Sequence, residues 1–360
     1  MRRSLIGLVV CFCLLASVVK AGDEPVEVKS DKIWGDNRKN LTYLSGNVSL
    51  KQGSNEITTE SAEVDLHKKI AIFKNKLQLT SSEVIIGADR LEYNLKAKTG
   101  TFLENVVLYR KELKDDRGNV TQDSLKLSAD NLYFESDTRN FQVPNQGLAE
   151  HKDFRGTADF IAYNDKRQEL TFLGNAKIKR PSGEEIVADE VIINTLNNSI
   201  IAKKRVRLVH EDVMILGDEL RYDYREKHGV FSSKVVLERA ETKDSAGKVV
   251  KDHFKLSTVG LEFDSDSKDF ATGGPGRVEH KDFIGFADLI EYRDKLQQMK
   301  LIGEAYLKRP EGEEVCGERM TVFIQDKSFT VSNHVDIHYQ VDPMNENQTS
   351  KKENAFRDGK

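Results

Sequence analysis

The stretch from Gly87 to Leu108, GADRLEYNLKAKTGTFLENVVL, decides the fold because its pattern returns throughout the chain. It opens with a small residue and an acid, Ala88 and Asp89, and two apolar residues follow with one polar residue between them, Leu91 and Tyr93. After a polar turn comes a second apolar set, Phe102, Val106 and Leu108. Recurrence of such a pattern at a constant interval predicts a repeat architecture.

The copies of the Asp89 position show two nested periods. These copies are Asp31, Glu60, Asp89, Asp130, Asp159, Asp189, Asp218, Val259, Asp288 and Glu318. Most steps between them have one short length, and the two steps that end at Asp130 and Val259 are longer because each carries an insertion. The insertions recur at a second, longer interval, at which His151-Lys152-Asp153-Phe154 also returns as His280-Lys281-Asp282-Phe283. We call the step from His151 to His280 the duplication interval, because duplication of a block of four repeats accounts for both periods.

Each repeat alternates apolar and polar residues, which is typical of strands that bury one face. No segment sustains helical spacing over ten residues. Each repeat is therefore predicted to form two strands joined by a polar turn, such as Asn94 to Gly100. About twenty such strands exceed what one flat sheet accommodates. We predict an all-β chain, an elongated antiparallel β-jelly roll of about ten two-stranded repeats in two tandem equivalent halves, with a β-solenoid as the alternative stacking.

Composition and charge indicate a folded chain without affinity for nucleic acid. Of the 360 residues, 38% are hydrophobic and 32% charged, and the net charge is −4. A nucleic-acid partner would require a basic stripe, which the sequence lacks. The repeats run without a linker, so the expected divisions are a first block at 22–188 and a second block at 189–339, continuous with the first. Residues 340–360 lose all alternation and are expected to form a disordered tail.

The segment 1–21 has the pattern of an export signal. Arg2 and Arg3 precede an apolar run from Leu5 to Val19, and Ala21 provides a small residue at the expected cleavage point. An uncleaved membrane anchor is the alternative, although this run is shorter than the roughly 20 residues that a span needs. Cleavage leaves Cys316 as the single cysteine, which excludes an internal disulfide. We therefore expect an exported, periplasmic protein.

Candidate chemical sites are few. His334, Asp336 and His338 would share one face of a strand within reach of one metal ion. Because Val335 and Ile337 belong to the inner apolar set, the simpler interpretation makes the His/Asp face a solvent face. The repeated His-Lys-Asp-Phe segments and the recurrent Asp, expected to cap a turn or start a strand, are also interpreted as structural. No nucleophile elbow or phosphate loop occurs, so we expect neither enzymatic activity nor a cofactor nor a metal.

The inner apolar face has two interpretations. It is either a packed core, as in any sandwich, or a groove in which strands offer Phe, Leu, Val and Ile to hydrocarbon chains while their outer faces remain wet. Alternation alone does not distinguish them.

Several phrases of the sequence resemble the periplasmic lipopolysaccharide-transport proteins of the LptA, LptC and OstA-like group. They are Val26 to Lys32, Leu44-Ser45-Gly46-Asn47-Val48, Gly87-Ala88-Asp89 with Tyr93, and Phe172-Leu173-Gly174-Asn175-Ala176. Phrases of the two kinds, apolar-x-Gly-Asn-Val and Gly-x-Ala-Asp-x-apolar-x-Tyr, alternate over nearly all of residues 26 to 339. The chain departs from the bridging members by holding two blocks where they usually have one, and its inserted loops are more similar to LptC-type members.

The resemblance implies a jelly roll that carries the acyl chains of lipopolysaccharide. It implies lipid contacts at Val26, Val28 and Phe102, although Glu104 stands where the motif has Gly. Adding the inner apolar column gives the full expected lipid-binding set: Val26, Val28, Leu44, Phe73, Leu77, Leu79, Tyr93, Phe102, Val106, Phe172, Phe231 and Leu301.

The expected partners are lipopolysaccharide or lipid A, an inner-membrane ABC transporter complex and an outer-membrane translocon. The latter two would join through edge strands, and head-to-tail self-association is a further expectation. Trp34, near the first edge, is expected to contact a partner or to be a plain exposed aromatic residue. The alternatives are a lipid-free β-solenoid scaffold and a membrane-anchored LptC-like adaptor.

Overall fold

The computed structural model describes residues 27–338 except 37–38, 53–54, 66 and 137. In this part of the chain almost every element is an antiparallel β-strand, and a single short 3-10 helix, η2 (Asp294–Leu296), is the exception. The prediction of an all-β jelly roll is confirmed. The expected signal segment, Val26 and the expected tail lie outside the described residues.

The described residues form two compact units, 27–211 with 216–228 and 212–215 with 229–338. The repeat boundary expected between residues 188 and 189 falls within a strand of the first unit. The first unit contains β1 (Glu27–Lys29), β2 (Lys32–Asp36), β3 (Leu41–Gln52), β4 (Asn55–Asp65), β5 (Ile70–Thr80), β6 (Val84–Asn94), β7 (Thr99–Arg110), β8 (Leu113–Lys114), β9 (Val120–Gln122), β10 (Leu125–Glu135), β11 (Asn140–Val143), β12 (Gly147–His151), β13 (Phe154–Ala158), β14 (Phe160–Asn164), β15 (Glu169–Lys179), β16 (Glu185–Asn194), β17 (Ser199–His210) and most of β18 (Val213–Asp223).

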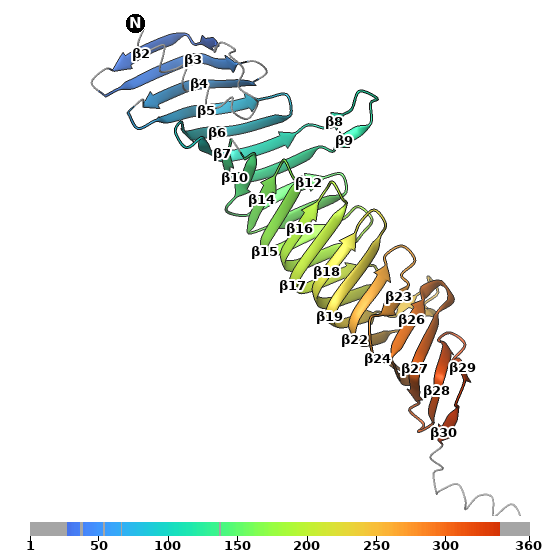
Figure 1. The fold of residues 1–360 in the computed structure, drawn as a ribbon. Coiled ribbons are helices and arrows are strands. Elements are labelled where there is room, and N and C mark those ends of the chain that lie inside the picture. The colour runs from blue at the N-terminus through green and yellow to red at the C-terminus, as the bar shows by residue number, and fades with distance from the viewer. Residues whose placement is uncertain (1–26, 37–38, 53–54, 66, 137, 339–360) are drawn as a thin grey trace, which may run out of the picture. The chain divides into compact units, whose positions relative to one another are not determined.

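The second unit contains β19 (His228–Arg239), β20 (Thr242–Lys243), β21 (Val249–Lys251), β22 (Phe254–Asp264), β23 (Phe270–Thr272), β24 (Gly276–His280), β25 (Phe283–Ala287), β26 (Leu289–Arg293), η2, β27 (Gln298–Lys308), β28 (Glu314–Phe323), β29 (Ser328–Ser332) and β30 (Asp336–His338). The two insertions form the separate hairpins β8–β9 and β20–β21. Figure 1 shows β8–β9 projecting away from the strands of the first unit.

The long strands bend near their middle, which gives each unit two facing sheets. The register shifts at these points, for example between Ser45 and Val48 in the β3–β4 pair and between Leu173 and Ala176 in β15–β16. Such bulges kink a strand and increase its twist. In the fourth and eighth repeats the bend breaks the strand in two, so that β11 and β12, or β23 and β24, replace one long strand. Bending lets one strand contribute to both sheets of the roll.

The recurrent acid of the repeat lies at this bend and binds an asparagine from the bend of the next strand. The pairs include Asp31 with Asn47 (3.2 Å), Asp89 with Asn105 (2.6 Å) and Asp159 with Asn175 (2.8 Å). Each Asn has a positive φ, and so does the residue before it, which is Gly46, Glu104 or Gly174. Left-handed backbone favours glycine and asparagine. The acid thus stabilises the bend, a role more specific than the turn cap or strand start that the sequence indicates.

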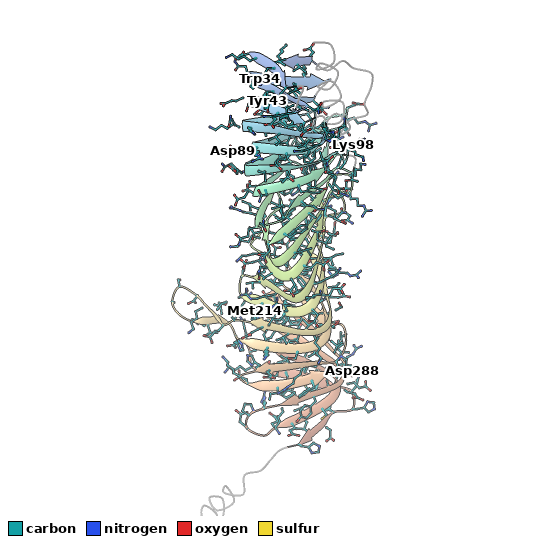
Figure 2. The ribbon with its side chains drawn as sticks, turned by 90° about the vertical axis from the view of Figure 1, so that its left-hand side faces the viewer. Trp34, Tyr43, Asp89, Lys98, Met214 and Asp288 are labelled. Carbon is teal, nitrogen blue, oxygen red and sulfur yellow. The ribbon has the colours of Figure 1, made fainter. Side chains whose placement is uncertain are left out.

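The bends and the turns of the first unit lie on opposite sides of the roll. Figure 2 shows Asp89, at a bend, on one side and Lys98, in the β6–β7 turn, on the other. Because the turns of both sheets gather on the second side, we call it the mouth of the roll.

Candidate functional site

The predicted lipid-binding residues of the first unit point between the two sheets. Tyr93, Phe73, Phe102 and Phe172 are at most 1% exposed. Leu44, Leu77 and Val106 are also buried, whereas Val28 on the first strand and Leu79 near the mouth are half-buried. In the second unit, Phe231 and Leu301 are fully buried. The inward orientation predicted by alternation is therefore present in each unit, and the side chains are packed against one another.

The backbone at Phe102 forms despite its departure from the motif. Glu104 adopts φ of 64°, close to the 73° of Gly174 in the matching phrase. The following Asn105 still binds Asp89. A residue with a side chain is uncommon in this region but tolerated, so the bend next to Phe102 is retained.

An apolar cleft opens at the mouth of the first unit. It is narrow, with a volume of about 40 Å³, and it is partly open to solvent. Its apolar lining consists of Ile57, Leu79, Val84, Ile86, Phe134 and Phe141. Small-molecule sites have this character, a concave apolar surface with few polar groups. Of the predicted set, only Leu79 lines this cleft.

Beside the cleft, charged side chains join the turns of the two sheets. The Arg139 guanidinium binds both Glu83, in the β5–β6 turn, and Asp165, which follows β14. Asp165 also accepts the hydroxyl of Tyr163 at 2.8 Å and lies 3.9 Å from Arg110 Nε. Burial acts to lower the pKa of Arg139, but the hydrogen bonds and charges of Glu83 and Asp165 together outweigh it, so that pKa is raised. Burial also raises the pKa of Tyr163, which stays a neutral donor. This cluster holds the turns of the two sheets together at the mouth of the first unit.

The second unit has an equivalent cluster, one duplication interval further along the chain. Arg239 donates to Asp294 Oδ1 at 3.1 Å, and Lys251 lies 2.5 Å from Asp294 Oδ2. Lys268 pairs with Asp212 at 3.3 Å. Sequence reasoning did not identify these charged residues. The duplication interval was the available signal, because Arg110 and Arg239, like Asp165 and Asp294, occupy the same position in the two copies.

The repeated His-Lys-Asp-Phe segments place a histidine against two carboxylates. His151 lies 3.9 Å from Asp123 and 3.6 Å from Asp153, and the three groups could surround a metal ion. However, His151 Nδ1 accepts the backbone amide of Asp153, and the Lys152 ammonium lies 3.0 Å from Asp123. Burial lowers the pKa of His151. A neutral histidine stacked on Phe154, with the carboxylate already paired, favours a structural role.

The sequence-derived metal candidate lies at the last described strands. His334 Nδ1 lies 2.7 Å from Glu318, which makes it the bend partner of that acid. Asp336 and His338 are both largely exposed and 3.5 Å apart. The solvent-face interpretation fits this placement.

At the opposite end of the described chain, Trp34 stacks on Tyr43 at 4.9 Å (Figure 2). Ile33 pairs with Leu44 and shares its inner face, yet it is 52% exposed. Ile33 thus has the direction of an inner residue without its burial, because β2 lies at the edge of the sheet.

Two family models match the sequence. The model for the LptA and LptD N-terminal lipopolysaccharide-transport protein matches residues 85–199, and the model for OstA-like proteins matches residues 17–117. No curated protein matches.

Among solved structures, the chain is similar to LptH, the LptA-homologous periplasmic component of the lipopolysaccharide transport device from Pseudomonas aeruginosa. The identity is 14%, with 42% of this chain and 84% of that chain covered and a TM-score of 0.22. The WD40 domain of SCAP from fission yeast matches at 8% identity, with 88% and 91% covered and a TM-score of 0.14. The described residues contain no helix with the length and apolarity needed to cross a membrane.

Proposed function

Because the chain belongs to the OstA-like family of lipopolysaccharide-transport proteins, we propose that it carries lipopolysaccharide through the periplasm. The acyl chains of lipid A would lie against the apolar inner faces, and its polar head would remain outside the mouth. The observation that carries this proposal is the apolar cleft at the mouth of the first unit, which continues into the buried inner set at Leu79.

Acyl chains would enter by separating the two sheets at the mouth. Keeping a methylene out of water is favourable by about 0.8 kcal/mol, so a chain of a dozen carbons gains enough to replace contacts between Phe73, Phe102 and their neighbours. The charged cluster at Arg139 would limit this opening. Its guanidinium, 23% exposed, would also offer a cation to a phosphate of the lipid head.

The terminal strands would join the carrier to its partners. Edge strands present unpaired backbone groups and accept a further strand. The proposed partners are the inner-membrane extraction complex and the outer-membrane translocon. An exported bridge and an anchored LptC-like adaptor differ in the fate of residues 1–21. N-terminal sequencing of the exported protein separates them, since a chain beginning at Gly22 is a cleaved one.

Site-specific photo-crosslinking tests lipid binding. A photoreactive residue at Phe73, Phe102 or Phe231 should capture lipopolysaccharide in cells. Glu92, which is exposed on the outer face of the same strand as Tyr93, is the matched control and should not. Capture at Glu92 alone would refute the proposal.

A dry-core scaffold is the second candidate, and the near-complete burial of the inner side chains favours it. Native mass spectrometry of the purified chain distinguishes the two functions. Bound lipid is expected for the carrier, and a lipid-free chain that also takes up none from vesicles is expected for the scaffold.

A further inference from the structure

A cavity with a mixed polar and apolar wall lies among the turns of the second unit. Most of its wall comes from the β24–β25 turn, the β27–β28 turn, the end of β28 and the start of β29. The cavity has a volume of about 270 Å³ and is partly open to solvent. Because one water molecule occupies about 30 Å³ in the liquid, this space has room for several waters or for one small organic ring.

His280 lines this cavity and has a buried donor without an acceptor. Its side chain is 1% exposed, and its Nδ1 accepts the backbone amide of Asp282 at 3.2 Å. Burial lowers the pKa of His280, so the imidazole is neutral at pH 7, and its proton lies on Nε2 because Nδ1 is an acceptor. Nε2 has no hydrogen-bond partner among the described residues, since Asp252 Oδ2 is 3.7 Å away. A bound molecule that supplies an acceptor would satisfy this donor.

Asp282 lines the same cavity and offers an acceptor. Its Oδ2 lies 3.9 Å from His280 Nδ1, is buried, and accepts no hydrogen bond within the described part of the chain. The Lys327 ammonium lies 3.5 Å from this oxygen, at the distance of an ion pair. The wall therefore presents a free donor and a free acceptor side by side. Hydroxyl groups, which both donate and accept, suit such a wall.

The charges of the wall disfavour an ionic ligand. Arg309 and Lys327 line the cavity as cations, and Asp282 and Glu311 line it as anions. An anion would meet the two carboxylates. A metal ion would compete with Lys327 for Asp282 and would find Nε2 of the histidine protonated. A neutral ligand with several hydroxyl groups meets neither obstacle.

Aromatic rings form the apolar part of the wall, and two of them are particular to the second unit. They are Phe283, Phe323 and Phe329. One duplication interval before Phe323 and Phe329 the chain has Asn194 and Ile200. Phe329 also packs on the Arg309 guanidinium, 4.8 Å from its ring centre, which holds that cation in the wall. Apolar rings beside a few polar groups are typical of small-molecule sites.

The equivalent place in the first unit is occupied by the protein itself. Tyr224 is 5% exposed, and its ring centre lies 5.3 Å from the guanidinium of Arg180, the duplicate of Arg309. Burial, and after it the charge of Asp153, raises the pKa of Tyr224, which places the tyrosine near the duplicate of Asp282. A ring with a hydroxyl group thus fills the first copy of this place.

We propose that the cavity of the second unit binds one sugar ring, a neutral ligand with several hydroxyl groups. The hydroxyls would accept from His280 Nε2 and donate to Asp282 Oδ2, and the C–H face of the ring would pack against Phe323. Two sources offer such a ring, the saccharide head of the proposed lipid cargo and a free glycan. The inference rests on the proposed function for the first source only.

Ligand-observed NMR tests this site. The probes are methyl glucoside, methyl galactoside and methyl mannoside, with inorganic phosphate and Zn²⁺ as ionic probes, and the protein is the full mature chain. At least one hexoside should receive saturation from the protein and shift the Nε2 resonance of His280. Asp282→Ala should weaken its binding by about tenfold, because a charged acceptor is lost. The matched control Asp153→Ala, at the duplicate acid of the first unit, should leave binding unchanged.

A second variant acts on the apolar wall. Phe329→Ile gives the second unit the residue that the first has at this position, so the fold should tolerate it, and it should also weaken the hexoside. Circular dichroism verifies that each variant folds. No binding of any hexoside, equal binding by Asp282→Ala and the native chain, or tighter binding of phosphate or Zn²⁺ would overturn the inference.

A competition experiment identifies the source of the sugar. The competitor is the saccharide of lipopolysaccharide freed of its acyl chains. Displacement of the hexoside assigns the cavity to the head of the cargo, and a hexoside that stays bound assigns it to a free glycan. Lipid capture at Phe102 is measured separately, in the first unit, so that failure here leaves the carrier function standing.

Discussion

Arg110 in the first unit and Arg239 in the second are duplicates with different numbers of partners. Arg239 donates to Asp294, to the Asp252 carbonyl and to Gln297 Oε1, the last two at 2.9 Å. Arg110 donates to the Asp123 carbonyl, and its Nε and Nη1 have no hydrogen-bond partner. Both side chains are at most 2% exposed. Both copies therefore have a buried arginine at this position, but they differ in how many of its N–H groups have a hydrogen-bond partner.

Arg110 lacks a side-chain amide acceptor because the equivalent glutamine binds another donor. Gln168 is the duplicate of Gln297, but its Oε1 accepts the hydroxyl of Thr195 at 3.3 Å. The residue equivalent to Thr195 in the second unit is Ile324, which has no hydroxyl. Gln297 Oε1 is therefore available to Arg239. This hydroxyl is one of the differences between the two clusters, beside the exchange of Arg139 and Glu83 for Lys268 and Asp212. Several substitutions test the comparison.

Removing each arginine should have the largest and most unequal effect. Arg239→Met should lower the free energy of unfolding by about 3–5 kcal/mol, because it leaves the Asp252 carbonyl and Gln297 Oε1 without the donor they have in the native chain. Arg110→Met should cost less, by about 1–3 kcal/mol, because Arg110 has fewer hydrogen bonds to lose, while each carboxylate keeps a second cation, Arg139 at Asp165 and Lys251 at Asp294. Urea unfolding with hydrogen exchange on β26 and β14 measures the two effects separately. Equal losses would contradict the difference in satisfaction.

The bends offer a second comparison. Asn175 binds Asp159, whereas the duplicate position beside Asp288 holds Glu304. Both residues have positive φ, at 48° and 45°. Glu304→Asn should stabilise the second unit by about 1 kcal/mol, by adding a hydrogen bond and removing a carboxylate near another.

The reverse change, Asn175→Glu, is the matched control and should destabilise the first unit by a similar amount. Thermal unfolding measures the stability of both variants. A loss of stability in Glu304→Asn would show that the bends at Asp159 and Asp288 are not equivalent.

Thr195→Ile should make the first cluster resemble the second. With the hydroxyl removed, Gln168 Oε1 becomes available to Arg110, and the expected gain is about 0.5–1 kcal/mol. Ile324→Thr is the opposite change and should destabilise the second unit. If Thr195→Ile gains nothing in a background of Gln168→Leu but gains in the native background, the amide is confirmed as the acceptor.

The smallest expected effect is a pH dependence shared by the two units. Burial is the largest cause that lowers the pKa of each histidine, His151 and His280. Two carboxylates act to raise each pKa, and a lysine and an arginine act to lower it further. These groups are Asp153, Asp123, Lys152 and Arg110 for His151, and Asp252, Asp282, Lys281 and Arg239 for His280. Below the unfolded value of about 6.5 the unfolded chain binds more protons, so stability should decline as pH falls from about 7 toward 5.

Urea titrations across this range should show a shallower decline in the His151→Gln, His280→Gln double variant than in the native chain. An unchanged slope would assign the decline to other groups.

The repeat pattern predicted the strands and their inner faces, because alternation at period two states which side of a strand is buried. Phe73, Phe102 and Phe231 lie where that rule places them. It did not predict that Ile33 is exposed, since an edge has no neighbour to cover it and edges are not marked in a repeat. It also interpreted the recurrent acid as a turn cap or strand start, because the bond from Asp89 to Asn105 depends on the bend of two adjacent strands.

The sequence alone determined the strand content, the inward face of each repeat and the duplication, because these are periodic properties that each repeat states locally. Only the tertiary structure decided which charges meet across the mouth, such as Arg139 and Glu83, and which of the duplicate arginines Arg110 and Arg239 has more hydrogen-bond partners. These pairings join residues that lie far apart in the sequence, and their distances follow from where the bent strands place their ends.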